Sequence, residues 1–352
     1  MPDKTKSLFR PKEFSIALLA VLGTVIAMPG AGAQTVEEFY RGKRVNLVTS
    51  ASVGGGYDQY ARLLAKHMPR HIPGQPTIIV QNMTGAEGLK AGNYLYSMAA
   101  QDGSVIGGLQ RNNGLARFYA VNDAAIQFDA NKFHWLGSPQ QEVGLFILST
   151  KLGLKSLDDL KKQEVAISST GHNSPSSIYA RMLNALYGSK LKPVEGYNGS
   201  QAALLAFERG EVDGHISGGS SGAFRARILP WIEKGEAKVI MQMGINADPA
   251  FPNAPTAIDV VSSPADKQLF EIAFAEQVMG RPFLLPPGVP ADRVKALRAA
   301  FDATMKDPIF LEDAKAQNVE IDPISGEQIN ALLDRVYAAP PEVAGRIRDL
   351  AK

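Results

Sequence analysis

Short apolar runs and segments of helical period alternate along most of this chain. Runs rich in Val and Ile predict strands at Val45–Ser50, Thr77–Asn82, Val105–Gln110, Val143–Thr150, Val165–Ser169 and Val212–Ser217. Apolar residues at helical spacing predict helices at Gly88–Ala99, Ser176–Tyr187 and Gln201–Glu211, and a further one through Tyr60, Leu63, Leu64 and Met68. Strands that alternate with helices in this way predict parallel sheets covered by helices, which is an α/β fold.

The C-terminal third has a different pattern, because helical segments follow one another there. They are expected at Asp292–Lys306, Ile309–Asn318 and Ser325–Ala338, each with an acidic, proline or serine start signal. We expect these helices to cover a lobe rather than to build another one.

The N-terminus has the pattern of an export signal. Four basic residues precede an apolar run over Ser15–Met28, and Ala31, Gly32 and Ala33 offer the small residues of a cleavage site. The apolar run is shorter than the roughly 20 residues of a spanning helix, so cleavage is favoured over a retained anchor. We therefore expect residues 1–33 to be a signal peptide and the protein to be periplasmic, with Gln34 as its new terminus.

Composition narrows the class of partner. The chain has no cysteine, so it has no disulfide and no lipidation site at the expected terminus. Without residues 1–33 it has 33 basic and 33 acidic residues, and this balance argues against nucleic acid or a membrane surface as partner. The 319 remaining residues exceed what one core usually organises, so two lobes are expected.

A glycine-rich turn, Gly54–Asp58, leads from the first strand into its helix. The first turn of a helix leaves N–H groups unpaired, and glycine lets a ligand approach them, so the turn is suited to bind an anion. The alternative is that it is only a tight connection between strand and helix. The dinucleotide fingerprint would need glycine at Gln59, and a P-loop would need Gly-Lys-Ser/Thr at the start of the helix. Both nucleotide motifs are therefore excluded, and we expect no cofactor.

The histidines and one serine motif are candidates for catalytic or metal sites. His67 and His71 are four residues apart, but Pro69 lies between them, so surface positions are expected and no metal site is predicted. The run Gly218–Gly222 matches the nucleophile elbow of esterases, with Ser220 as nucleophile. In that fold the histidine follows the serine, whereas the last histidine here is His215, so an exported esterase is the weaker alternative.

Five small polar turns are each expected after a strand and before a helix. They are Gly54–Asp58, Met83–Gly88, Gln110–Asn113, Thr170–Ser177 and Tyr197–Ser200. Ligands bind at the carboxyl ends of parallel strands, so these turns are expected to converge on one cleft. Their N–H, hydroxyl and amide groups can hold a carboxylate without reacting with it.

Three regions carry a resemblance to a known family. They are VNLVTSASVGGGYDQYARLLAKHM, TIIVQNMTGAEGLKAGNYLYSMAAQDGSVIG and GYNGSQAALLAFERGEVDG. They resemble the signature regions of the substrate-binding proteins of tripartite tricarboxylate transporters, the Bug-type receptors. The resemblance implies a two-lobed, type II-like periplasmic binding protein, with a mainly parallel sheet in each lobe and a ligand cleft between the lobes.

The resemblance also implies function and organisation. A monomeric, non-enzymatic receptor would capture a small organic acid and deliver it to a membrane complex of one large and one small integral subunit, or alternatively to a sensor protein. Lobe 1 is expected at residues 34–137 and 275–352, and lobe 2 at residues 138–274. Ligand contacts are expected at Gly54, Gly55, Gly56, Tyr57, Asp58, Thr84, Gly85, Ala86, Glu87, Gln110, Arg111, Ser169, Thr170, Ser174, Ser177, Asn198, Gly199 and Ser200.

Three of these residues have an open role. Asp58 either orients a polar ligand group or only caps its helix. Tyr57 stands where many members of the family have a smaller residue, and it either stacks on a ligand ring or lies at the rim. Arg111 either pairs with a second ligand carboxylate or is also a rim residue.

Overall fold

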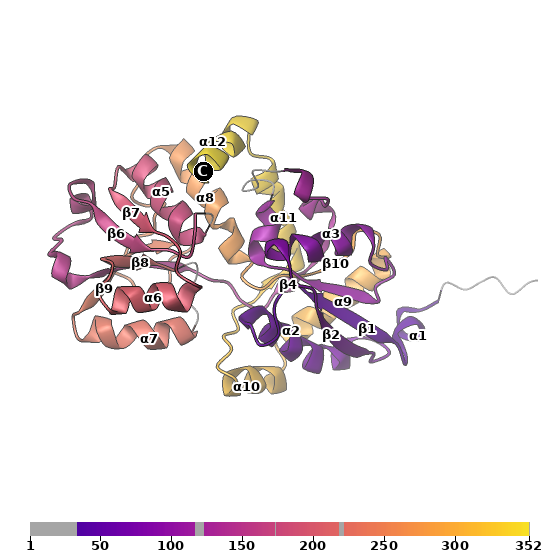
Figure 1. The fold of residues 1–352 in the computed structure, drawn as a ribbon. Helices are drawn as coiled ribbons and strands as arrows, with labels where there is room; N and C mark the ends of the chain where they lie inside the picture. Colours follow the sequence, from indigo (N-terminus) through magenta and orange to yellow (C-terminus); the bar gives the residue numbers. More distant parts are fainter. Residues whose placement is uncertain (1–33, 117–122, 173, 218–221, 352) are drawn as a thin grey trace, which may run out of the picture. The chain divides into compact units, whose positions relative to one another are not determined.

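The computed structural model describes residues 34–116, 123–172, 174–217 and 222–351, and the described residues from Thr35 onward group into one compact unit. Two β-sheets with flanking helices make up this unit (Figure 1), which confirms the predicted α/β class. The predicted signal peptide, residues 1–33, lies outside the described residues. Within the described residues, none of the helices combines the length and the apolar character needed to cross a bilayer.

The first sheet takes strands from both ends of the described chain. Its order is β11-β4-β10-β3-β1-β2. The strands are β1 Arg44–Thr49, β2 Thr77–Asn82, β3 Val105–Gly108, β4 His134–Ser138, β10 Phe283–Leu285 and β11 Ile324–Ser325. β1 pairs in parallel with β2 and β3, whereas β10 and β11 pair antiparallel with their neighbours.

The second sheet has the order β7-β6-β8-β5-β9. Its strands are β5 Gly144–Ser149, β6 Val165–Ser168, β7 Leu191–Val194, β8 Gly214–Ile216 and β9 Ala237–Met243. β6 pairs in parallel with β7 and β8, and β5 pairs antiparallel with β8 and β9. Both sheets are therefore mixed rather than mainly parallel. In the first sheet the antiparallel strands are β10 and β11, which the chain adds only after it has passed through the second sheet.

Helices cover both sheets. The described helices are α1 Val36–Tyr40, α2 Gly56–His67, α3 Leu89–Ser97, α5 Pro175–Tyr187, α6 Ser200–Glu208, α7 Gly222–Glu233, α8 Pro264–Val278, α9 Ala291–Thr304, α10 Pro308–Ala316, α11 Gly326–Tyr337 and α12 Pro341–Ala351. As expected, α9 and α11 pack on the first sheet, at β4. α12 instead packs on α5 and α8 (Figure 1).

α8 contributes Leu269, Phe270 and residues 272–275 to a hydrophobic core that includes residues of both sheets. Its Phe274 ring lies 5.1 Å from the Tyr179 ring of α5, and the Phe270 ring stacks on Phe274 at 5.4 Å. Of the two expected lobe boundaries, the one after residue 137 falls inside β4 and the one after residue 274 falls inside α8. The division into lobes at these residues stays a prediction.

The start of α11 leaves no space for a side chain at Gly326. A Cβ atom there would lie 2.0 Å from the Trp135 backbone oxygen. We expect Gly326→Ala to lower the free energy of unfolding by about 1–3 kcal/mol, because overpacking forces the backbone to shift. Gly345→Ala in α12 is the control, since nothing lies within 4 Å of its Cβ position. Urea denaturation measures both, and equal stability of the two variants would contradict the expectation.

Candidate functional site

A cavity of about 850 Å³ lies where the turns after β3 and β6 meet residues of α5 and α8. It is lined by Tyr57, Leu89, Gln110, Arg111, Asn112, Asn113, Ala116, Ile126, Glu142, Thr170, Gly171, His172, Ser174, Pro175, Ile178, Tyr179, Glu276 and Arg281. The lining includes apolar side chains, hydroxyl groups, amides and both signs of charge. Such a mixture can orient a small polar ligand.

The cavity brings together five of the residues expected to touch ligand. They are Tyr57, Gln110, Arg111, Thr170 and Ser174. Gln110 and Arg111 follow β3, and Thr170 follows β6, so both parallel strands present their carboxyl ends to the same space. With Tyr57 from the turn Gly54–Asp58, three of the five small polar turns therefore reach it.

The other expected contacts do not line this cavity, and their ligand role stays a prediction. Three of them are buried, namely Asp58, Ser169 and Ser177, and Glu87 belongs to the 3-10 turn Ala86–Gly88. The others are exposed or half-buried: Gly54, Gly55, Gly56, Thr84, Gly85, Ala86, Asn198, Gly199 and Ser200.

Asp58 holds the glycine-rich turn together. Its carboxylate accepts hydrogen bonds from the Gly54 amide at 2.9 Å, Arg62 Nε at 2.8 Å and Asn82 Nδ2 at 2.7 Å. Burial raises the pKa of Asp58, but these donors outweigh it and hold the pKa below its usual range. The N-cap of α2 is Gly55, so Asp58 is not the cap residue, and its contacts stabilise the turn rather than line the cavity.

A cluster of serine hydroxyls holds the start of α5. Ser169 Oγ lies 2.7 Å from both Ser174 Oγ and Ser177 Oγ and accepts from Ser176 Oγ at 2.9 Å. Ser174 is the N-cap of α5, yet its side chain does not hydrogen-bond to the helix amides. The Ser174 side chain thus does not cap the first turn of α5, which lies next to the cavity.

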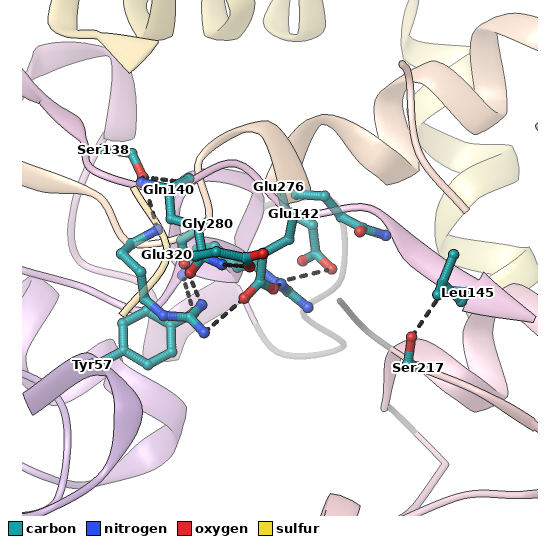
Figure 2. A network of polar contacts seen from close by, with 12 residues as sticks. Tyr57, Ser138, Gln140, Glu142, Leu145, Ser217, Glu276, Gly280 and Glu320 are labelled. Atoms are coloured by element: carbon teal, nitrogen blue, oxygen red, sulfur yellow. Dashed lines mark hydrogen bonds and ion pairs between the residues drawn. The ribbon is translucent and has the colours of Figure 1, made fainter. Parts of the chain in front are cut away.

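Charged residues that are far apart in the sequence form a network at the cavity wall (Figure 2). Glu142 pairs with Arg111 and with Arg281, whose Nη2 lies 2.7 Å from Glu142 Oε1. Burial works against the charge of Arg111, but Glu142 raises the pKa of Arg111 above its usual range. Arg111 is therefore a charged wall residue that already has a protein carboxylate as partner.

Tyr57 also has a protein partner. The Arg281 guanidinium lies over the Tyr57 ring, 4.4 Å from its centroid, and the Tyr57 hydroxyl accepts from the Arg111 amide at 3.2 Å. A guanidinium over an aromatic face is attracted by the π electrons of the ring. One face of Tyr57 is thus covered by Arg281, so in this structure the ring shapes the wall of the cavity.

Glu276 is the second acidic residue of the wall, in the last turns of α8. Tyr179 Oη donates to Glu276 Oε1 at 3.1 Å, and Gln277 Nε2 donates to Tyr179 Oη at 3.0 Å. Arg111 Nε is 3.9 Å away from Glu276 Oε1, which is too long for a hydrogen bond. Burial raises the pKa of Glu276, and Arg111 offsets only part of this shift.

Sequence patterns do not reveal the residues that complete this network. Glu142 and Arg281 lie on the two segments that join the sheets, and Glu276 lies in a helix whose period gives no sign of a site. Only the position of Glu142, just before the Val143–Thr150 strand pattern, gave a local hint. Long-range packing through α8 brings the three residues together.

His67 and His215 are buried and bonded to other protein groups. His67 is buried rather than at the surface, because α10 covers the end of α2 and Asp313 bonds to His67 Nε2 at 2.6 Å. Ser220 of the esterase motif lies outside the described residues. His215 Nδ1 lies 2.9 Å from Ser168 Oγ in the core of the second sheet. Among the described residues, no group of three or more His, Asp or Glu is placed to hold a metal ion.

Several known proteins are similar to this chain in sequence or in fold. No protein-family model matches the sequence. Protein BugT of Bordetella pertussis is 25% identical over 254 residues, which cover 69% of this chain and 73% of BugT. A TctC solute-binding protein from Polaromonas matches with a TM-score of 0.69 and 18% identity, over 88% of this chain and 99% of that one. The chain has the fold of the TctC binding proteins.

Further structures share this TctC-type fold over 88% of the chain. The periplasmic binding protein BugD matches with a TM-score of 0.59 at 20% identity, over 98% of its length. MatC from Rhodopseudomonas palustris, with bound malate, has a TM-score of 0.56 at 20% identity, over 99% of its length. Rpa4515 from R. palustris, with adipate, has a TM-score of 0.58 at 17% identity, over 97% of its length.

These matches confirm the resemblance to Bug-type receptors that the three sequence regions indicate. The TctC protein and BugD are described as binding proteins, in agreement with a receptor rather than an enzyme.

Proposed function

We propose that this protein is a periplasmic receptor that captures a small organic acid and delivers it to a tripartite tricarboxylate-type transporter. One observation carries the proposal: the start of α5, which the Ser174 side chain does not cap, lines with Thr170 the same cavity as Arg111 and Arg281. The relatives in fold with bound malate and adipate support a small carboxylate as ligand.

The start of α5 suits a carboxylate for physical reasons. A carboxylate loses hydration when it enters a cavity, so it needs several hydrogen-bond donors there. The first turn of a helix supplies N–H groups and a partial positive charge, and α5 is long enough, with 13 residues, to have this effect. The Thr170 and Ser174 hydroxyls add further donors beside it.

The periplasmic location in this proposal rests on the N-terminal sequence. The basic start, the apolar run and the Ala-Gly-Ala site support a signal peptide over residues 1–33. Intact-mass analysis of protein taken from the periplasm should give a chain that begins at Gln34. A retained residue 1–33 segment would contradict the periplasmic part of the proposal.

The organic-acid part can be tested on the purified protein. A thermal-shift series with malate, succinate, adipate, citrate and benzoate should contain at least one acid that raises the melting temperature, because such a ligand binds only the folded state. Simple activated esters should not be hydrolysed. A series in which no acid has an effect would overturn the proposal.

We expect Thr170→Val to weaken binding of the most stabilising acid by roughly 1–3 kcal/mol, the usual cost of leaving a buried polar group without its partner. Isothermal titration measures the change. Thr77→Val is the matched control, because Thr77 is an exposed residue of β2 outside the cavity. If both variants bind like the wild type, Thr170 is not a ligand donor.

A further inference from the structure

We infer that the ligand of this cavity carries a protonated nitrogen in addition to its carboxylate, and that Glu276 accepts this group. The inference rests on the proposed function and narrows its substrate class from organic acids to small amino-carboxylates. Four charged wall residues carry it: Arg111, Arg281, Glu142 and Glu276.

The two arginines already share one carboxylate. Arg111 and Arg281 both pair with Glu142, and Arg281 in addition lies over the Tyr57 ring. Glu276 has a weaker set of contacts, namely the Tyr179 hydroxyl at 3.1 Å and the distant Arg111 Nε at 3.9 Å. Glu276 is therefore the wall carboxylate whose charge is least neutralised by its neighbours.

Because Glu276 is buried, its carboxylate needs a cationic partner. Only 4% of the residue is exposed, and a carboxylate in such surroundings is costly unless it is paired with a cation. The raised pKa of Glu276 reflects the same cost. A ligand with carboxylates alone would bring more negative charge next to it, whereas an ammonium group would neutralise it.

The distance along α5 between Ser174 and Tyr179 also fits the length of such a ligand. Ser174 lies at the start of α5, and Tyr179, which contacts Glu276, lies further along the same helix. The helical rise between these two positions is about 7.5 Å. This spacing suits a small zwitterion with its carboxylate at the start of α5 and its ammonium group at Glu276.

Matched pairs of ligands test the inference. Isothermal titration compares aspartate with succinate, glutamate with glutarate, and 4-aminobutyrate with butyrate. We expect the amino member of at least one pair to bind about tenfold or more tightly than its partner, as for a hydrogen bond to a charged group. Glu276→Gln should remove this preference while it keeps an acceptor for Tyr179. Glu320→Gln, which changes a carboxylate outside the cavity wall, should keep the preference.

The outcomes separate the two proposals. If succinate, glutarate and butyrate each bind as tightly as their amino partners, the inference is wrong and the receptor for organic acids stands. If Glu276→Gln binds with the wild-type preference, the inference is also wrong. If no member of any pair binds, and no acid of the thermal-shift series does, both proposals fail. Should Glu276→Gln not fold, the comparison of pairs on the wild-type protein still decides.

Discussion

Arg111→Met should both destabilise the protein and abolish most of its ligand binding. The variant leaves Glu276 without its nearest cation and leaves Glu142 with Arg281 alone. Breaking a buried ion pair by removing one partner costs about 3–5 kcal/mol. We expect a loss of this size in the free energy of unfolding, and at least a hundredfold weaker binding of whichever acid the wild type prefers. Urea denaturation and isothermal titration measure the two effects.

A matched control shows whether the effect comes from the charged network or from the loss of any arginine. Arg209 is largely exposed and contacts only Glu211 at 3.9 Å among the ion pairs of the described residues. Arg209→Met should therefore change stability by less than about 1 kcal/mol, as for most surface ion pairs. If Arg111→Met is as mild as this control, the network at the cavity wall does not stabilise the protein.

The stability of the protein should fall with acidification because of His215. Burial lowers the pKa of His215 to about 4 from its ordinary value of 6.5. The folded state thus binds the proton less well than the unfolded state does. The resulting stability is fully present above pH 6.5 and is lost as the pH falls from 6.5 towards 4, by about 3 kcal/mol over the whole window.

His215→Asn removes the titrating group and keeps an acceptor near Ser168, which lies 2.9 Å from His215 Nδ1. Urea denaturation at pH 7 and pH 5 should show a smaller difference between the two pH values for the variant than for the wild type. Equal pH dependence of the two proteins would show that His215 does not limit acid stability.

The sequence predicts local elements well where strand and helix signals are strong. The apolar run Thr77–Asn82 coincides with β2, and the pattern at Ser176–Tyr187 corresponds to α5 Pro175–Tyr187. The sequence also identifies the turns at Gln110 and Thr170, because small polar residues after buried strands indicate the carboxyl ends of a sheet.

The sequence does not predict the charged wall of the cavity. Glu142 and Arg281 lie on linking segments without periodicity, and Glu276 is one acidic residue in an otherwise mostly apolar stretch of α8. Their proximity depends on tertiary packing in the core that α8 shares with residues of both sheets, which no local pattern encodes. The role of Asp58 was open for a similar reason, since its partner Asn82 lies 24 residues away at the end of another strand.

The central claim is that this cavity binds an organic acid, and a crystal structure with the most stabilising acid tests it most directly. The account predicts a ligand carboxylate within hydrogen-bonding distance of Thr170 or Ser174 at the start of α5, inside the cavity walled by Arg111 and Glu276. Ligand bound elsewhere, for instance in the groove along α9 that Lys295 and Arg298 line, with the cavity at α5 empty, would contradict it.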